Sequence, residues 1–132
     1  MRYMLDTNIC IYLIKRRPPA VIDRFLRCDV GQVAISSVTL AELQYGVAKS
    51  QFPEKNAEAL QAFLLPLEIL PFDDAAGAAY GPIRVDLEKR GVSIGAMDLM
   101  IAAHALSLDV TLVTHNIREF SRVEGLRVET WA

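Results

Sequence analysis

Residues 1–15 read MRYMLDTNICIYLIK, and in this stretch the carboxylate of Asp6 stands between two apolar runs. The run Arg2–Leu5 is short and mostly apolar, which predicts a buried strand, and the run after Asp6 predicts a helix. A charge beside buried apolar residues is costly unless a partner compensates it. Asp6 is therefore a candidate functional residue.

The rest of the chain alternates between the same two kinds of element. Further strands are predicted at Gln32–Ile35 and Val110–Val113, with weaker candidates at Glu68–Leu70 and Leu126–Glu129. Helices are predicted after Asp6, from Pro18-Pro19 to near Cys28, from Ser36-Ser37 to about Lys49, from Pro53 to about Leu65, from Asp73-Asp74 to near Gly91, and from Met97 to Ser107. Such alternation predicts a single α/β domain over residues 1–132, with a mainly parallel central sheet covered by helices on both faces.

Composition narrows the class further. The 132 residues are 52% hydrophobic and 23% charged, which is typical of a globular domain with its own core. No apolar run approaches the roughly 20 residues of a membrane helix, so we expect a cytoplasmic protein without a membrane span. The formal charge of −2 argues against binding nucleic acid through a global positive field. A local basic rim remains compatible with that charge.

Parallel strands carry their functional side chains at the carboxyl edge of the sheet, and four distant segments are expected to meet there. Asp6 follows the first strand directly. The helix after Gln32–Ile35 begins at the same edge, which places Glu42 within about 9 Å of it. Asp98 lies in the first turn of the helix that precedes Val110–Val113, and residues 114–116 leave that strand at the same edge.

Each acid also has a structural explanation. Asp6 has the position of a helix cap, Glu42 of a capping-box partner of Thr39, and Asp98 of an acid that favours a helix N-terminus. Three carboxylates at one rim nevertheless repel one another, at about 4 kcal/mol for a pair roughly 4 Å apart in an effective dielectric of 20. A bound cation removes that repulsion. Ligands that are all carboxylate oxygens favour Mg²⁺ or Mn²⁺ over zinc.

Four motifs, in this order, resemble one known family. They read D-T-N at Asp6–Asn8, S-S-x-T-x-A-E-L at Ser36–Leu43, M-D-x-M-I-A-A-H-A at Met97–Ala105 and V-T-H-N-x-R-E-F at Val113–Phe120. The chain is similar over nearly its whole length to PIN-domain ribonucleases, and more narrowly to the VapC toxins of bacterial toxin–antitoxin pairs.

The resemblance implies a three-layer PIN fold and a Mg²⁺-dependent endoribonuclease, with Mn²⁺ as a substitute ion. Asp6 and Asp98 match the family's metal ligands, and Glu42 matches its third acid. Asn116 stands where some relatives have Asp, and Glu119 is the next acid, which puts a second tightly held metal in question. The resemblance further implies an antitoxin that covers the site, a homodimer within a larger toxin–antitoxin complex, and cleavage of a structured RNA such as initiator tRNA.

Other residues near the rim have supporting roles in this interpretation. Those expected to donate or accept hydrogen bonds, or to add charge, are Thr7, Asn8, Ser37, Thr114, Asn116 and Glu119. The cations placed to guide an RNA backbone are Arg118 and the run Lys15, Arg16 and Arg17. Two alternatives stay open. One is a phospho-acceptor signalling domain, although adjacent acids and a lysine at the strand ends are missing, and the other is an inactive PIN-like binding module.

Overall fold

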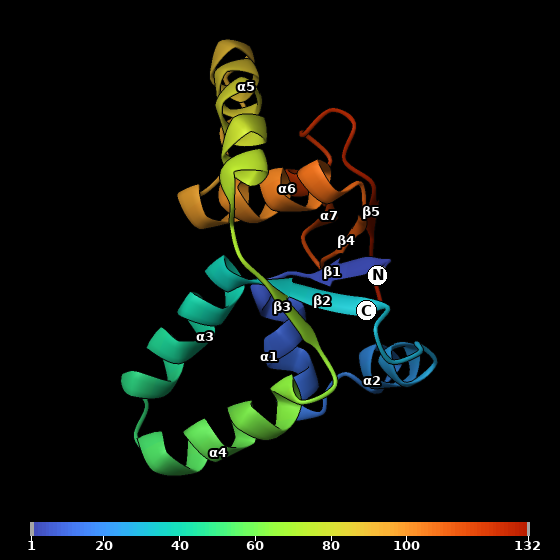
Figure 1. Cartoon of the computed structure of the whole chain (residues 1–132), viewed down its shortest axis with the longest axis vertical. Helices are drawn as coiled ribbons and strands as arrows, with labels where there is room; N and C mark the ends of the chain where they lie inside the picture. The colour runs from blue at the N-terminus through green and yellow to red at the C-terminus, as the bar shows by residue number, and fades with distance from the viewer. Residues whose placement is uncertain (1, 132) are drawn as a thin grey trace.

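The computed structural model describes residues 2–131, and its strands and helices alternate along the chain (Figure 1). The strands are β1 (Tyr3–Leu5), β2 (Val33–Ser36), β3 (Glu68–Leu70), β4 (Thr111–Val113) and β5 (Val128–Glu129). The helices are α1 (Thr7–Lys15), α2 (Pro19–Leu26), α3 (Ser37–Ala48), α4 (Pro53–Leu64), α5 (Asp74–Arg90), α6 (Ala96–Leu108) and α7 (Ile117–Phe120).

The sheet has the order β3-β2-β1-β4-β5, and neighbouring strands are parallel to one another. The first strand of the chain is therefore the central one. Met4 lies opposite Ala34 on one side and Leu112 on the other. The predicted α/β fold with a parallel sheet is confirmed. Because all strands point the same way, the segments that follow β1, β2 and β4 leave from one edge.

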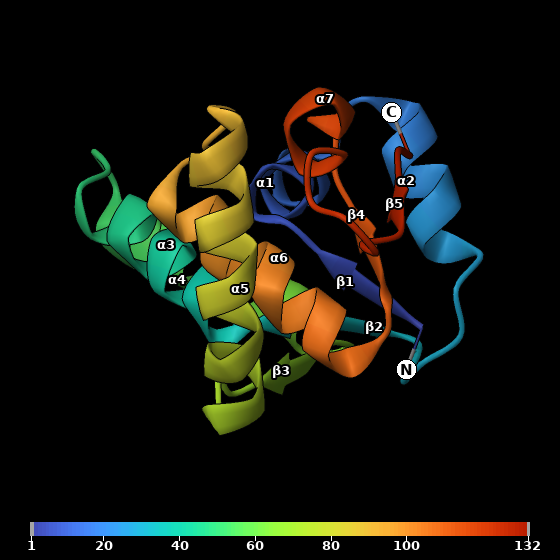
Figure 2. The same ribbon diagram turned by 90° about the horizontal axis from the view of Figure 1, so that it is seen from above.

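Helices cover both faces of this sheet and make three layers. In Figure 1, α5 and α6 lie above the sheet, while α1, α3 and α4 lie below it, and Figure 2 shows α5 and α6 crossing over the strands. Successive side chains of β1 point to opposite faces of the sheet, as in any pleated strand, and so belong to two different cores. Tyr3 and Leu5 belong to the core shared with α1 to α4, and Met4 belongs to the core shared with α5 and α6.

Local signals explain most helix boundaries. Asp73 caps α5 by accepting a hydrogen bond from the Ala76 N–H at 3.1 Å, and α5 ends at Gly91, whose φ of 68° is the left-handed conformation that favours glycine. Several details differ from the sequence prediction, and β1, β2 and β4 each have a bound that is shifted by one residue. The final strand is shorter, at Val128–Glu129, and the short helix α7 was not predicted.

The end of the sheet is tied to α2 by one arginine. Arg24 pairs with Glu129 at 3.1 Å, and its guanidinium lies over the rings of Tyr3 and Trp131 at 5.6 and 5.5 Å from their centroids. These contacts order α2 against the sheet, on the side away from α5 and α6. Within residues 2–131, no helix is both long enough and apolar enough to cross a membrane.

Candidate active site

Asp6 lies at the junction of β1 and α1, where the sequence places it. Its side chain is 3% exposed and caps α1, with Oδ1 accepting a hydrogen bond from the Ile9 N–H at 2.9 Å. Oδ2 accepts a hydrogen bond from the hydroxyl of Thr114, which follows β4. Burial raises the pKa of Asp6, and the negative charge of Glu42 adds to that rise, while the two hydrogen bonds act in the opposite direction.

Glu42 comes to the same edge on α3. The hydroxyl of Thr7, the first residue of α1, donates to Oε1 of Glu42 at 2.6 Å. This bond joins two helices that leave neighbouring strands, so the sheet topology explains how residues 35 positions apart meet. The helix face that Glu42 shares with Val38, Ala41 and Tyr45 is only partly buried, because Val38 is in the core while the other two are exposed. Glu42 itself is half-buried.

Asp98 lies in the first turn of α6, as predicted, and its side chain is half-buried. The pKa of Asp98 is raised to about 6, first by burial and then by the charges of Asp6, Glu42 and Glu119 in that order. Carboxylates from α3, α6, α7 and the end of β1 therefore lie within one another's electrostatic field. The predicted convergence of distant segments is present in the fold.

We call Asp6, Glu42, Asp98 and Glu119 the acid cluster. None of the salt bridges within residues 2–131 includes any of these four side chains. Carboxylate oxygens that are not engaged in salt bridges are chemically suitable ligands for a hard divalent ion. In the described part of the chain, however, no three His, Cys, Asp or Glu side chains stand ready to hold one ion together. Hydroxyl donors from Thr7 and Thr114 already engage Glu42 and Asp6.

The loop after β4 orders the supporting residues. Thr114 is fully buried, and its Oγ1 accepts a hydrogen bond from the Asn116 N–H at 2.9 Å while donating to Asp6. Asn116 caps α7 by accepting from the Glu119 N–H at 3.4 Å, and this short helix carries Glu119 toward Asp98. The Asn116 side chain thus positions an acid of the cluster.

Two other predicted supporting residues lie differently. Ser37 uses its hydroxyl to accept a hydrogen bond from the Phe72 N–H at 3.0 Å, so it joins α3 to the segment after β3. Ser36, rather than Ser37, caps α3, because its hydroxyl accepts from the Val38 N–H. Asn8 is exposed in the first turn of α1 and, within residues 2–131, forms no hydrogen bond with the acid cluster.

The predicted RNA-contacting cations are all exposed. Arg118 lies in α7 beside Glu119, and Lys15 is the last residue of α1. Arg16 and Arg17 follow in the turn before α2. Lys15 thus lies at the far end of the helix that follows Asp6, and Arg118 is next to Glu119 in the sequence.

Sequence reasoning missed one interaction that links two site helices. His104 is 1% exposed in α6, and its Nδ1 lies 2.8 Å from the Ser36 hydroxyl, the cap of α3. The ring also packs edge-on against Phe72, with 5.6 Å between centroids. Ser36 is at the end of a strand and His104 lies in an Ala-rich helix. The only sign of their contact in the sequence is that each of these predicted core segments contains a polar residue.

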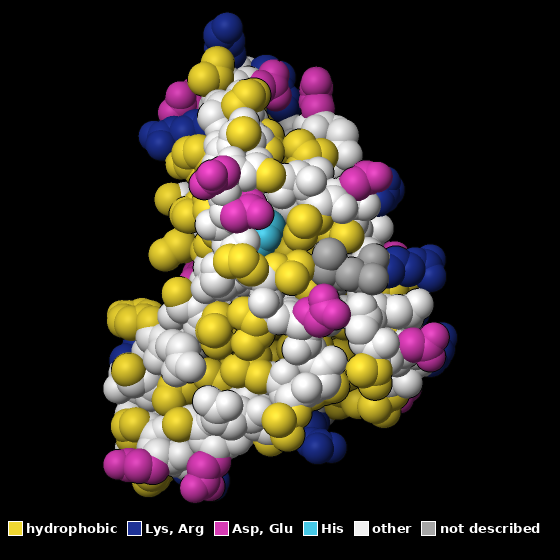
Figure 3. Space-filling model, viewed as in Figure 1, with side chains coloured by type: hydrophobic (Ala, Val, Ile, Leu, Met, Phe, Trp, Pro, Cys, Tyr) yellow, Lys and Arg dark blue, Asp and Glu magenta, His cyan; other side chains and the backbone are white. Residues whose placement is uncertain are grey.

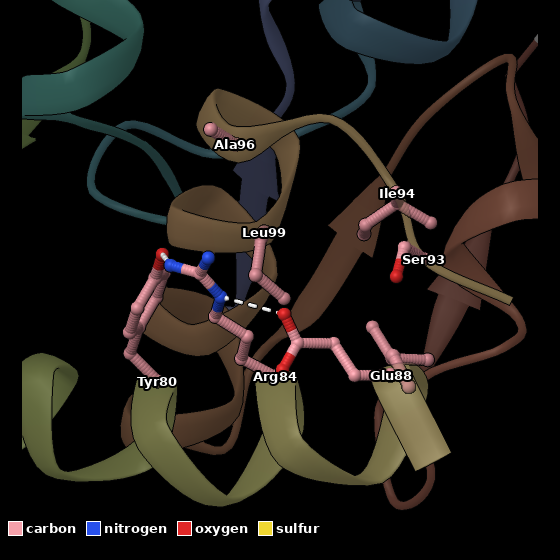
Figure 4. Close-up of a pocket in the computed structure, with 8 residues that line it drawn as sticks. Tyr80, Arg84, Glu88, Ser93, Ile94, Ala96 and Leu99 are labelled. Carbon is pink, nitrogen blue, oxygen red and sulfur yellow. Dashed lines mark hydrogen bonds and ion pairs between the residues drawn. The ribbon is translucent and has the colours of Figure 1, made fainter. Parts of the chain in front are cut away.

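A small cleft beside the start of α6 is separate from the acid cluster. Its volume is about 150 Å³, and Figure 4 shows Tyr80, Arg84 and Glu88 of α5 facing Ala96 and Leu99 of α6 across it. Arg84 pairs there with Glu88 at 3.2 Å. The cleft contains none of the three acids that the sequence predicts.

Fold and site together define a PIN domain. The PIN-domain family model matches residues 3–126, and the chain belongs to this family. Its sequence relatives place it more narrowly among the VapC ribonucleases. A Shigella flexneri protein named tRNA(fMet)-specific endonuclease VapC is 47% identical over 132 residues, which cover 100% of this chain and 99% of that protein. Ribonuclease VapC2 of Haemophilus influenzae is 47% identical over 131 residues, covering 99% and 98%.

Solved structures agree with this assignment. The crystal structure of DNA-bound VapBC from Salmonella typhimurium matches with a TM-score of 0.95 and 42% identity, covering 100% of this chain and 99% of that one. VapBC2 from Rickettsia felis, bound to a DNA fragment from its promoter, matches with a TM-score of 0.92 and 44% identity over the full length of both chains. The expected PIN fold is confirmed by these matches.

Proposed function

We propose that the protein is the toxin of a toxin–antitoxin pair, a Mg²⁺-dependent endoribonuclease that hydrolyses phosphodiester bonds in a structured RNA. The observation that carries this proposal is the acid cluster, in which carboxylates from four distant segments meet and none of them forms a salt bridge within residues 2–131. Its membership of the PIN family and its likeness to VapC ribonucleases support the same reaction.

The carboxylate oxygens of the acid cluster are the type of ligand that Mg²⁺ prefers, and Mn²⁺ is expected to substitute for it. Asp6 and Asp98 would hold the ion, because both are carboxylates at the edge and the charge of Asp6 raises the pKa of Asp98. When bound, the ion would supply Lewis-acid polarisation of the phosphoryl group and a more acidic water.

The remaining residues would position the reactants. Thr114 holds one oxygen of Asp6 and the Ile9 N–H holds the other, which fixes the direction of that carboxylate. Glu42, held by Thr7, would complete the ligand set or orient the attacking water and receive its proton. Water would attack phosphorus on the side opposite the leaving oxygen, whose bond to phosphorus breaks and which takes a proton from solvent to leave as a hydroxyl group.

Initiator tRNA is the proposed substrate, because the Shigella relative is named for cutting tRNA(fMet). The structural relatives are VapBC complexes, which supports a cognate antitoxin as partner. An apolar cavity of about 300 Å³ between α1, α3 and α4 has Glu42 at its edge and offers that partner a place to bind. Figure 3 shows hydrophobic side chains gathered on this face. A homodimer within a larger toxin–antitoxin complex remains a prediction.

The decisive experiment is cleavage of purified initiator tRNA by the purified chain. Asp6→Asn and Asp98→Asn should each lower the rate at least 100-fold in Mg²⁺, with Glu42→Gln close behind, because each removes a charge from the cluster. EDTA should abolish cleavage by the unmodified chain. Asp23→Asn and Glu58→Gln remove exposed acids outside the cluster and should leave the rate unchanged. Equal cleavage in EDTA and Mg²⁺, or by all three cluster variants, would refute the mechanism.

A further inference from the structure

A cavity of about 450 Å³ lies along α1 beside the acid cluster. Its lining residues come from α1, the turn that follows it, and the loop after β4: Ile11, Tyr12, Lys15, Arg17, Pro18 and His115. This volume is within the range of about 300–1,000 Å³ that small-ligand sites have. The acid cluster does not line the cavity, so it is a separate feature of the surface.

Two rings form one wall of this cavity. Tyr12 and His115 meet edge to face, with 5.9 Å between their centroids and 72° between their planes. Tyr12 is half-buried, so its ring is held in place, while His115 is exposed. Aromatic side chains held at a surface are the usual platforms on which unpaired nucleic-acid bases stack.

The cavity is close to the acids that would cut the RNA. His115 directly follows Thr114, whose hydroxyl is bonded to the Asp6 carboxylate. A chain of nucleotides passing Asp6 would therefore have a neighbouring nucleotide at the rings.

The cations at this cavity are free to bind an anion. Within residues 2–131, Lys15 and Arg17 take part in no salt bridge, whereas Arg24, Arg84, Arg90 and Arg127 each pair with an acid. Both side chains are exposed. In a protein with a formal charge of −2, two unpaired cations beside two rings form a local site for a phosphate and its base.

We propose that this cavity is a subsite for one unpaired nucleotide next to the phosphate that is cut, with its base against Tyr12 and His115 and its phosphate at Lys15 and Arg17. The inference rests on the proposed ribonuclease function and adds a specificity element to it. A base inside a duplex is already stacked and cannot enter the cavity. The subsite therefore selects single-stranded loops.

The test is binding of fluorescein-labelled octauridylate to the full chain in EDTA, measured by fluorescence anisotropy. Tyr12→Leu should weaken binding at least fivefold, because it removes a stacking platform. Tyr12→Phe keeps the ring and should bind as the unmodified chain does. Tyr45→Leu makes the same change at an exposed tyrosine outside the cavity and should have no effect. Thermal unfolding of each variant verifies that it is folded.

Two further measurements distinguish the contribution of the base to binding from that of the phosphate. Octauridylate paired with octaadenylate should bind the Tyr12→Leu variant and the unmodified chain equally. Lys15→Gln and Arg17→Gln should each reduce the slope of log K against log salt for the single strand by about 0.7. The control is Lys89→Gln, which removes an exposed lysine at the far end of α5 and should leave the slope unchanged.

The outcomes distinguish this inference from the proposed function. Cleavage of tRNA together with unchanged octauridylate binding by Tyr12→Leu would overturn the subsite alone. Failure of the unmodified chain to bind octauridylate would overturn it too. Tyr12-dependent binding without any RNA cleavage would keep the subsite and refute the nuclease. If Tyr12→Leu weakens only the binding of a protein partner, the cavity serves that partner and the subsite is refuted.

Discussion

Asp98 is a residue whose ionisation the fold opposes. Its pKa lies at about 6, against an ordinary 3.8, because of burial and of repulsion from neighbouring acids. In the unfolded chain these acids are far apart, so the repulsion is a cost of the folded state alone. A residue suited to hold a cation is thus a source of instability when no cation is bound.

Asp98→Asn should therefore stabilise the protein in EDTA at pH 7. The change removes one charge and keeps the size of the side chain, relieving a cost on the order of 1 kcal/mol after solvent screening. In saturating Mg²⁺ the order should reverse, because the unmodified chain gains binding energy that the variant lacks. Thermal unfolding of both proteins in both buffers measures this. A less stable variant in EDTA would make Asp98 a structural helix-start residue instead.

The same residue predicts a dependence on pH. Between pH 3.8 and about 6 the folded state binds more protons at Asp98 than the unfolded state does, so its contribution to the free energy of unfolding falls as pH rises through this window. Urea unfolding in EDTA at several pH values should show this decline in the unmodified chain. The decline should be smaller in Asp98→Asn, and an unchanged profile would contradict the raised pKa.

At the scale of elements, the bond between His104 and Ser36 joins α6 to the start of α3, and these helices carry Asp98 and Glu42. His104→Leu should destabilise the protein by about 1–3 kcal/mol, because a buried hydroxyl loses a partner. Urea unfolding measures the loss. His115→Leu changes an exposed histidine and should have little effect on stability. Equal stability of both variants would show that the bond contributes nothing.

Burial of His104 also makes the free energy of unfolding depend on pH, with a sign opposite to the dependence caused by Asp98. Burial lowers the pKa of His104 from its ordinary 6.5, so the folded state resists protonation and stability is lost as pH falls below 6.5. The effect is best measured in the Asp98→Asn protein, where the opposing titration is absent. There, His104→Leu should flatten the loss of stability on the acid side, and a persisting loss would assign it to other groups.

Strands and capped helices could be predicted from the sequence because their signals are local. Glu68–Leu70 was predicted at its observed bounds, and Asp73 and Gly91 mark both ends of α5. The helix α7 has only four residues and depends on the Asn116 cap, which leaves no periodic pattern. The three acids were identified from topology. The hydroxyl donors from Thr7 and Thr114 to specific carboxylates depend on side-chain placement that no spacing reveals.

At the scale of the whole molecule, the face between α1, α3 and α4 remains apolar and accessible. Val47→Glu places a charge in that cavity and should weaken binding of the cognate antitoxin at least tenfold while tRNA cleavage persists. Val85→Glu puts the same charge on α5, in the opposite layer, and should not affect the antitoxin. Affinity measured by calorimetry distinguishes the two. Equal binding by both variants would place the partner on another face.

The central position of β1 also bears on how the protein is made. Asp6 is synthesised early, but its partner Thr114 follows 108 residues later, and β1 has no β4 to pair with until then. At about 5–20 residues per second, the nascent chain spends several seconds with its carboxylates apart. The candidate site therefore cannot assemble until β4 and Thr114 have left the ribosome.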